Sequence, residues 1–310
     1  HVDPGCGLSI PPKSWGAIEK LIWEFHQNQT KLGHEVHIRM ASQITLNEFD
    51  VVHCHVANLA IELGKRNIPY IYQLHDHHAY HFGKDSFVFK ENLEAIKGSL
   101  ITLLPAKFLV NYFDHPKCVY FSHGVNTEFF YPDLTKKKDK TFFMLANNGL
   151  AGNAGFDRKG FEYGIALASK LNTSITIAGP ENNKHFFNSH LWTLGYPKLE
   201  ILFDPTQEKV RELFQTHKIF LHPTMLEAGH PNLTMVEAAA CGTPIIADWE
   251  METDFHGAWR SPRDIFMMEL GYNDIISRYD DYSSQALTTA RNLDWYNRSI
   301  ELVKIYSQFL

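Results

Sequence analysis

The sequence is poor in cysteine, and its few cysteines form no motif. The chain has 310 residues, of which four are cysteine: Cys6, Cys54, Cys118 and Cys241. No two of them stand as Cys-x-x-Cys, so the sequence contains neither a zinc knuckle nor a dithiol redox motif. Scattered single cysteines are typical of a reduced, intracellular protein. We therefore expect a cytoplasmic location.

An excess of basic residues and a long apolar run are also missing. The 29 lysines and arginines are outnumbered by 35 aspartates and glutamates, which gives a net charge of -6. A nucleic-acid-binding surface usually has the opposite balance, so we expect no nucleic acid as main partner. The most apolar run, 99–113, is interrupted by Pro105 and Lys107 and is too short to cross a bilayer. No segment resembles a signal peptide.

The remaining composition indicates a packed globular protein. Hydrophobic residues make up 44% of the chain and charged residues 21%, which predicts an ordered core. A chain of 310 residues suits two domains of ordinary size better than one. The chain opens with His1 rather than Met, and residues 1–14 are typical of a loop. We expect a first strand to lie upstream of this loop.

Strand and helix patterns alternate along the chain and fall into two halves. A lysine-rich segment with turn residues, 131–140, separates them, and we expect Lys136, Lys137 and Lys138 to be solvated there. Short apolar strands separated by helices predict an α/β protein with parallel sheets wound on both faces. Such sheets bind ligands at the carboxyl ends of their strands. The site is therefore expected in a cleft between the two halves.

The predicted elements follow from the apolar periodicity. Strands of the first half are expected at 34–41, 49–55, 69–75, 99–104 and 117–122. Ser14 is expected to cap a helix with one face formed by Trp15, Ile18, Leu21, Ile22 and Phe25, and another helix includes Phe108, Leu109 and Tyr112. In the second half, strands are expected at 141–147, 174–179, 199–204, 218–223 and 243–248, and helices near 160–170, 206–216, 233–241 and 282–309.

The stretch 227–248 is the first candidate site. It follows an apolar strand and leads into an alanine-rich helix. Asn232 is a favourable N-cap, which leaves the amides of Leu233 and Thr234 to bind an anion at the helix N-terminus. Glu237 lies about one turn inside the helix, where a carboxylate suits hydroxyl groups beside a phosphate, such as those of a ribose. The stretch fits a nucleotide diphosphate site and, equally, an ordinary capped helix with Glu237 on its solvent face.

The segment 147–171 is the second candidate site. A strand leads into a glycine-rich loop, then Arg158, Lys159 and Gly160, then an amphipathic helix. Two cations at the start of a helix oppose the helix dipole, and a bound polyanion would offset this. The alternative is a surface turn with two solvated bases. We favour anion binding, because this loop is predicted to leave the same sheet edge as the first site.

The histidine-rich segment 73–81 is the third candidate. His75 ends a predicted strand and is followed by Asp76 and three further histidines. A metal site is one alternative, but the tight spacing differs from that of the usual ligand pairs on a helix. We favour the other alternative, in which one histidine faces the cleft and the rest are ordinary polar loop residues, so no metal is expected. His53 and His55 share one face of a nearby strand and are expected to have structural roles.

Taken in order, motifs over most of the chain resemble the group 1, or family 4, glycosyltransferases of GT-B architecture. The glycine-rich loop 5–16 and KLGHEVHI resemble the beginning of the family's first domain, and SHGVNTEFFYP resembles the link between its domains. RKGF resembles the donor turn, FLHPTMLEAGHPNLTMVEAAACGTPII the donor-binding strand and helix, and NLDWYNRSIELVKIY the final helix. The second-half matches are the more specific ones.

The resemblance implies two Rossmann-like, doubly wound domains that face a central cleft. Residues 1–135 would form the acceptor-side domain and 136–292 the nucleotide-sugar-binding domain, with 293–310 as a helix that crosses back. The implied activity is a retaining, hexosyltransferase-type transfer of a sugar from a nucleotide diphosphate sugar to an acceptor hydroxyl. The sequence has no Asp-x-Asp, so metal-independent transfer without a cofactor is expected.

The resemblance also implies roles for individual residues. Catalytic roles fall to His75, Glu227 and Lys159. Donor binding falls to Arg158, Lys159, Gly229, His230, Pro231, Asn232, Leu233, Thr234 and Glu237, and the acceptor side to Gly5, Gly7 and Asp76. The family has two glutamates with seven residues between them; Glu237 matches the second, whereas Gly229 stands at the first position, and the AGHPN turn would return Glu227 to the sugar.

The implied donor is a UDP- or GDP-sugar, and the implied acceptor is a glycan, a lipid-linked sugar or a small molecule. A local basic patch would permit peripheral contact with a membrane. Two other classes stay open. One is a different GT-B enzyme, such as a sugar-nucleotide epimerase or a phosphorylase. The other is a non-catalytic sugar-nucleotide-binding protein.

Overall fold

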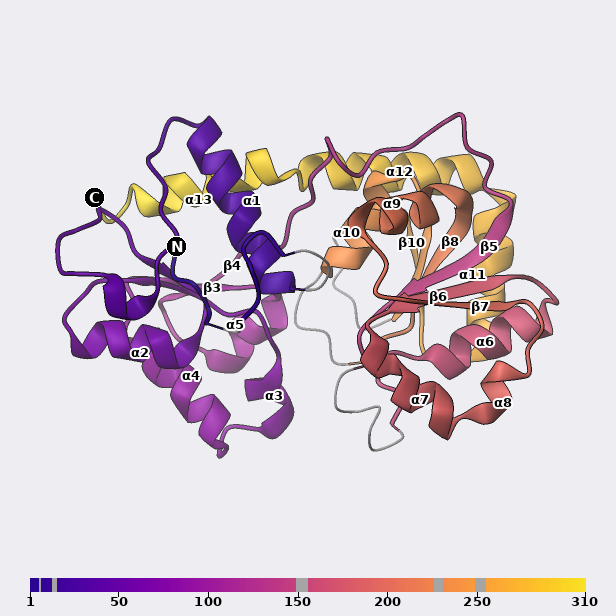
Figure 1. Cartoon of the computed structure of the whole chain (residues 1–310), viewed down its shortest axis with the longest axis horizontal. Helices are drawn as coiled ribbons and strands as arrows, with labels where there is room; N and C mark the ends of the chain where they lie inside the picture. Colours follow the sequence, from indigo (N-terminus) through magenta and orange to yellow (C-terminus); the bar gives the residue numbers. More distant parts are fainter. Residues whose placement is uncertain (6, 13–15, 149–155, 226–230, 249–254) are drawn as a thin grey trace. The chain divides into compact units, whose positions relative to one another are not determined.

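A computed structural model describes residues 1–5, 7–12, 16–148, 156–225, 231–248 and 255–310 (Figure 1). These residues form two compact units. Unit 1 holds the described parts of His1–Gly124, Glu227–Asn232 and Leu293–Leu310, and unit 2 those of Val125–Leu226 and Leu233–Asn292. The chain is α/β in both units, as the alternating pattern predicts. The domain boundaries given above stay a prediction.

Unit 1 is built on a four-stranded parallel sheet in the order β1-β2-β3-β4. Its strands are β1 (His53–Cys54), β2 (Ile71–Gln73), β3 (Thr102–Leu104) and β4 (Cys118–Tyr120). Its helices are α1 (Ala17–Lys31), α2 (Ala57–Lys65), α3 (His78–Phe82), α4 (Phe87–Gly98), α5 (Lys107–Phe113) and α13 (Trp295–Tyr306), with a short 3₁₀ turn at Ala41–Gln43. Helices α2 and α4 pack together, and α1 packs against α13 (Figure 1).

The prediction of a strand at 34–41 is wrong. This segment contains no strand, only an isolated β-bridge that joins Arg39 to Val2. Short main-chain hydrogen bonds also run from Val2 N to His53 O (2.8 Å) and from Asp3 N to Arg39 O (2.8 Å). Because an extended segment becomes a strand only when a neighbour completes its ladder, the single bridge leaves 34–41 irregular.

The first helix starts later than the predicted cap implies. Helix α1 begins at Ala17, and Gly16, at a φ of 136°, is its N-cap. Ser14 and Trp15 lie outside the described residues. The predicted apolar face of this helix is confirmed for Leu21, Ile22 and Phe25, which are all buried.

Unit 2 has a six-stranded parallel sheet in the order β10-β9-β8-β5-β6-β7. Its strands are β5 (Lys140–Leu145), β6 (Ile175–Gly179), β7 (Leu199–Phe203), β8 (His217–His222), β9 (Ile245–Asp248) and β10 (Ala258–Ser261). Its helices are α6 (Phe161–Lys170), α7 (Lys184–Ser189), α8 (Leu191–Leu194), α9 (Gln207–Thr216), α10 (Leu233–Ala240), α11 (Ile265–Ser277) and α12 (Tyr279–Asn292), with a 3₁₀ turn at Glu181–Asn183.

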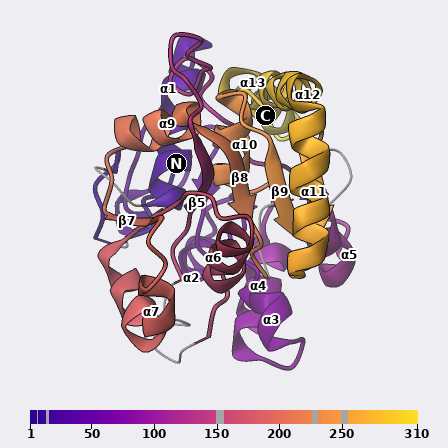
Figure 2. The ribbon, with the colours of Figure 1, turned by 90° about the vertical axis from the view of Figure 1, so that its right-hand side faces the viewer.

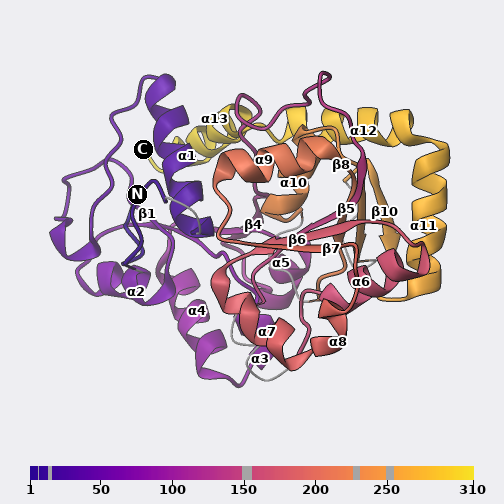
Figure 3. The same ribbon diagram turned by 45° about the vertical axis from the view of Figure 1, so that its right-hand side comes forward.

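Helices cover both faces of this sheet (Figures 2 and 3). On one face, alternate residues of β5 such as Phe142 and Met144 share a hydrophobic core with buried residues of α6 and α11. On the other face, Phe143 of β5 packs with Phe214 of α9 and Phe220 of β8, at ring-centroid distances of 5.0 and 5.9 Å. This alternation is what a parallel sheet buried on both sides requires.

Two predicted features of unit 2 and the C-terminal region are corrected. The helix expected at 282–309 is two helices, α12 and α13, because Asp294 caps a new helix by accepting from Tyr296 N at 2.8 Å. Strand β10 and helix α11 have no counterpart among the predicted elements. In the described ranges, none of the helices is long and apolar enough to cross a membrane.

Lys138 is not solvated, contrary to the prediction for the segment 131–140. Its ammonium donates to Phe214 O (2.8 Å), His217 O (3.1 Å) and Thr243 Oγ1 (2.7 Å). Burial lowers the pKa of Lys138 to about 8. The lysine therefore fastens this segment to the body of unit 2.

Candidate functional site

The loop that follows β5 leads to the start of α6 and places Lys159 inside unit 2. Lys159 is only 7% exposed, so the alternative of a surface turn with two solvated bases is wrong for this residue. Its amide donates to Oδ1 of Asn148 at 3.3 Å, and Asn148 is itself buried. The Asn148 amide donates to Oδ1 of Asn183 (3.0 Å), whose Nδ2 donates to Ala146 O (2.8 Å). The described part of the loop is thus tied back to the end of β5.

Gly160 allows this loop to approach the end of β8. It has a φ of 74° and is the N-cap of α6. A Cβ at this position would lie 2.4 Å from Pro223 O and 2.8 Å from a Pro223 ring carbon. Both the positive φ and the contact require glycine. The RKG turn therefore has a backbone reason for its glycine.

Arg263 holds the same loop from the other side, although nothing in the sequence analysis indicated it. Its guanidinium donates to Pro223 O (2.6 Å), to Asp157 O (2.7 Å) and to Arg158 O. Burial raises the pKa of the Asp157 carboxyl, while amides at the start of α6 and Arg263 act against that shift. Arg263 lies about a hundred residues from the loop in sequence, so only the fold reveals the connection.

The end of β8 contributes polar side chains next to Pro223. His222 is the last residue of the strand and is 6% exposed. Thr224 is 4% exposed, and its hydroxyl has no hydrogen-bond partner among the described residues. Because a buried hydroxyl without a partner costs free energy, Thr224 marks a place where a ligand oxygen would be favourable. The sequence analysis did not single out this residue.

Helix α10 carries Glu237, which is 5% exposed. The alternative that places Glu237 on a solvent face is therefore wrong. Pro231 is buried, and Asn232 directly precedes the helix; whether Asn232 caps it stays a prediction. The predicted site residues Glu227, Gly229 and His230 lie outside the part of the chain that the structure describes.

In unit 1, the predicted acceptor-side residues lie in loops. Gly5 and Gly7 are exposed and have φ values of 70° and 75°, and the Gly5 amide donates to Asp3 Oδ1 at 2.8 Å. Asp76 follows β2, and its carboxylate accepts from His78 N at 2.9 Å. These contacts explain the loop shapes; the acceptor role stays a prediction.

His75 belongs to a row of imidazoles rather than standing alone. Its Nε2 lies 2.9 Å from His55 Nδ1, and its ring stacks on that of His123 at 6.3 Å. Its Nδ1 is buried and has no hydrogen-bond partner in the described ranges. Burial, with a smaller effect of His123, lowers the pKa of His75 to about 3. His75 is thus neutral at ordinary pH.

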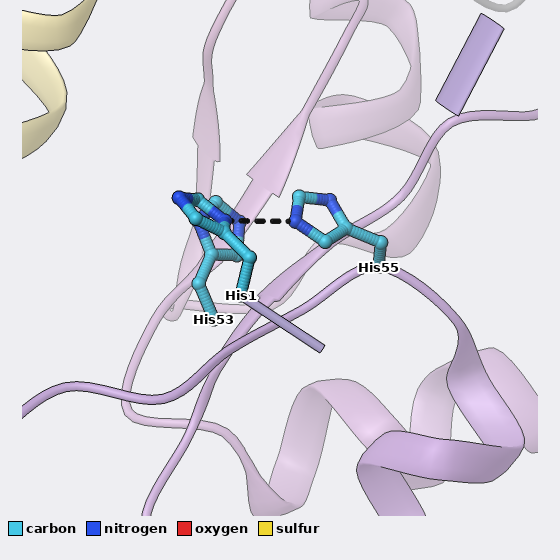
Figure 4. A group of neighbouring side chains, drawn as sticks. All are labelled: His1, His53 and His55. Carbon is cyan, nitrogen blue, oxygen red and sulfur yellow. Dashed lines mark hydrogen bonds between the residues drawn. The ribbon is translucent and has the colours of Figure 1, made fainter. Parts of the chain in front are cut away.

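The row continues through His55 to His53 and His1 (Figure 4). His55 Nε2 lies 3.1 Å from His1 Nδ1, and the rings of His53 and His55 stack at 4.3 Å. His53 and His55 are 2% and 3% exposed. Burial holds the pKa of both well below the ordinary value.

Comparisons with known proteins extend this description. The family model "Glycosyl transferases group 1" matches residues 150–249. AviGT4, a glycosyltransferase involved in avilamycin A biosynthesis, has a similar structure with a TM-score of 0.70 and 16% identity, covering 99% of this chain and 94% of that chain. The chain has the GT-B fold. Residues 150–249 of this GT-B chain carry the group 1 glycosyl transferase match.

Two further solved structures support the same fold. A sucrose-phosphate synthase from Thermosynechococcus elongatus has a TM-score of 0.68 and 14% identity, covering 84% of this chain and 73% of that chain. Anabaena HepE in complex with UDP has a TM-score of 0.68 and 11% identity, covering 84% and 79%. Among curated protein sequences, none matches the chain significantly. The fold prediction of two Rossmann-like GT-B domains is confirmed.

Proposed function

We propose that the chain is a retaining glycosyltransferase that moves a sugar from a nucleotide diphosphate sugar to an acceptor hydroxyl. The observation that carries the proposal is Lys159, a lysine 7% exposed, in a loop fixed by Gly160 and Arg263 at the carboxyl end of the unit 2 sheet. A cation in this place suits the diphosphate of a donor. The fold and the match to residues 150–249 support the same chemistry.

The donor diphosphate is assigned to Lys159, to Arg158 and to amides at the start of α10. Arg158 is partly exposed, and its guanidinium lies 3.4 Å from Asn147 O. The other proposed members of the donor site are Gly229, His230, Pro231, Asn232, Leu233 and Thr234. Fixed donors that face developing charge often supply the largest catalytic effect, about 3–4 kcal/mol for one group in other enzymes.

Sugar and ribose are assigned to other residues. Glu237, buried in α10, is proposed to accept from ribose hydroxyls, and Glu227 from hydroxyls of the transferred sugar. His75 is proposed to bind the transferred sugar, and Asp76, Gly5 and Gly7 are proposed to bind the acceptor. Because His75 is neutral, it offers the sugar one donor or one acceptor rather than a charge.

The proposed reaction breaks the bond between the anomeric carbon and the diphosphate oxygen and forms a bond to the acceptor oxygen. The acceptor proton passes to the departing phosphate, so no separate base is needed. Lys159 and the amides stabilise the negative charge on the leaving group. We propose that the transfer needs no metal, since these protein groups supply the positive charge.

A UDP-sugar is the first donor to test, because HepE was solved both with UDP and with UDP-glucose. Calorimetric titration with UDP, GDP and ADP, first without and then with magnesium, identifies the nucleotide. One nucleotide is expected to bind without metal. Lys159→Ala should weaken binding or turnover by about 100-fold, whereas Lys170→Ala, on the far end of α6 and paired with Glu269 at the surface, should not.

Binding of no nucleotide, or equal binding in the two lysine variants, would contradict the donor site. The runner-up is a sugar-nucleotide-binding protein without turnover, which Gly229 at the position of the family's first glutamate favours. Incubation of a bound UDP-sugar with and without acceptors separates the two. Turnover that requires an acceptor would support the transferase. Conversion of the UDP-sugar without an acceptor would support an epimerase, and binding without any turnover would support the binding protein.

A further inference from the structure

Three imidazoles in unit 1 meet at one point. One ring nitrogen from each of His1, His53 and His55 lies within 4.8 Å of the other two (Figure 4). His1 Nδ1 and His55 Nε2 are already 3.1 Å apart. Two nitrogens bound to one tetrahedral zinc ion at about 2.0–2.1 Å each would be about 3.4 Å apart. The three rings are therefore close to the spacing that one ion requires.

Each of the three rings also has a nitrogen within hydrogen-bond distance of a neighbouring side chain. His1 Nε2 lies 3.0 Å from Gln29 Oε1, and His55 Nδ1 lies 2.9 Å from His75 Nε2. His53 Nδ1 lies 2.6 Å from the hydroxyl of Tyr306. Metal-binding histidines almost always use their second nitrogen in this way, because the bond fixes both tautomer and ring orientation.

His53 has a second ring nitrogen besides the one beside Tyr306. His53 is 2% exposed, and its Nε2 makes no hydrogen bond of good geometry among the described residues, although the Gln73 side chain lies near the ring. A buried nitrogen of this kind costs free energy unless something binds it.

We propose that Nδ1 of His1, Nε2 of His53 and Nε2 of His55 bind one transition-metal ion of the zinc class. Imidazole ligands suit zinc, copper and nickel. Three nitrogens leave the fourth position of a tetrahedral ion to water or another ligand. His1, His53 and Tyr306 also line a pocket of ≈ 320 Å³, which gives an ion a route to the cluster.

A bound ion would fix the proton on His75. With its Nε2 on the metal, His55 carries its proton on Nδ1 and donates to His75 Nε2. His75 then carries its own proton on Nδ1, the atom that has no partner among the described residues. The ion would in this way turn Nδ1 of His75 into a hydrogen-bond donor. This step depends on the geometry of unit 1 alone and holds whether or not the chain transfers sugars.

The test is a titration of chelator-treated protein with zinc by calorimetry and with cobalt by visible absorption. We expect one ion per chain and a cobalt spectrum typical of tetrahedral coordination. His53→Gln and His55→Gln should each weaken binding by at least about 100-fold, and Tyr306→Phe by about 10–100-fold. His123→Gln is the matched control, because its ring stacks on His75 without belonging to the cluster, and should leave the affinity unchanged.

X-ray absorption of the zinc-loaded native chain needs no variant and covers the case in which a substitution prevents folding. Three nitrogens with imidazole scattering at about 2.0–2.1 Å are expected. Oxygen-dominated coordination, or affinity that persists in folded His53→Gln and His55→Gln chains, would overturn the proposal. Nitrogen-15 NMR tests the coupling: a proton on Nε2 of His75 in the zinc-loaded chain would overturn that part.

Discussion

The two units hold their polar groups by different means. In unit 2, the loop beside Lys159 is fixed by main-chain oxygens, by a glycine in close contact and by one arginine that stays charged. In unit 1, the polar interior is a row of neutral imidazoles joined ring to ring. A site made from the main chain keeps its shape over a wide pH range, whereas a row of histidines depends on where a few protons lie. We therefore expect the polar interior of unit 1 to depend on pH more strongly than the loop beside Lys159.

Acidification should give the largest effect and should act on unit 1 first. Burial lowers the pKa of His53, His55 and His75, for His75 to about 3. Below about pH 6.5 these histidines therefore bind protons in the unfolded chain but not in the folded chain. Stability is thus present above pH 6.5 and is lost as the pH falls. For each such histidine, the free energy of unfolding falls by up to about 1.4 kcal/mol for each pH unit below pH 6.5.

Hydrogen exchange measured at pH 7, 6 and 5 tests this on peptides from each unit. Unit 2 has a comparable group in His217, with a pKa lowered by burial to about 4, and should lose protection less steeply. Equal slopes in the two units, or earlier loss in unit 2, would break the comparison.

Gly160→Ala should be the most damaging single substitution considered for unit 2. The left-handed backbone costs about 1–2 kcal/mol for a residue with a Cβ, and the contact with Pro223 O adds about 1–3 kcal/mol. Gly33→Ala in unit 1 is the control, because its φ is 91° but a Cβ there meets nothing within 4 Å. Urea unfolding of both variants separates the contact from the backbone strain; equal losses would mean that the contact relaxes.

Arg263→Met should destabilise unit 2 by about 3 kcal/mol. The change leaves three carbonyls without their charged donor, and hydrogen bonds to charged groups contribute about 1.5–3 kcal/mol each without full additivity. Arg278→Met is the control, because Arg278 is exposed and its pair with Asp274 is screened by solvent, so its loss should change stability little. Thermal unfolding gives the first comparison. If the loop before α6 binds the donor as proposed, nucleotide affinity should fall only in Arg263→Met. Unchanged affinity would show that the hydrogen bonds of Arg263 do not shape a nucleotide site in this loop.

Glu237→Gln should give the smallest effect, about 2 kcal/mol in nucleotide affinity, from the loss of charged hydrogen bonds to ribose. The measurement compares the nucleotide with its 2′-deoxy analogue in both proteins. The native chain should prefer the ribonucleotide, and the variant should lose most of that preference. Glu162→Gln, a partly exposed residue of α6, is the control. A preference that survives in Glu237→Gln would remove Glu237 from the ribose.

Sequence patterns located much of the unit 2 framework because its strands are short and apolar, and the central ones are buried on both faces. Strands β5 to β9 lie where the apolar runs predicted them, and the turn at Gly160 follows from local residues. The prediction of a strand at 34–41 was wrong because a strand needs a neighbouring strand to pair with, and the periodicity of one segment does not show whether such a neighbour exists. The prediction that Lys138 is solvated was wrong for a related reason. Its hydrogen-bond acceptors lie on other elements, so the polar segment around it does not reveal them.

The sites show the same limit. Lys159 and Glu237 were singled out because each stands in a recognisable motif, and their roles in binding stay predictions. Arg263 and Thr224 have no local signal, since their partners lie on other elements. His53 and His55 were noticed as a pair on one strand, but His1, Gln29 and Tyr306 join them only through the fold. Spacing along one segment therefore understates any cluster assembled from several segments.

The main-chain anchoring of the loop before α6 has a consequence for how the protein can change. Pro223 O accepts from Arg263, and Arg158 O accepts from Arg263 and from the Met225 amide, so the side chain of Met225 carries no part of these hydrogen bonds. Met225 is 39% exposed. We therefore expect that position 225 can be randomised in a library without loss of the scaffold, which makes it a starting point for evolving a different donor preference.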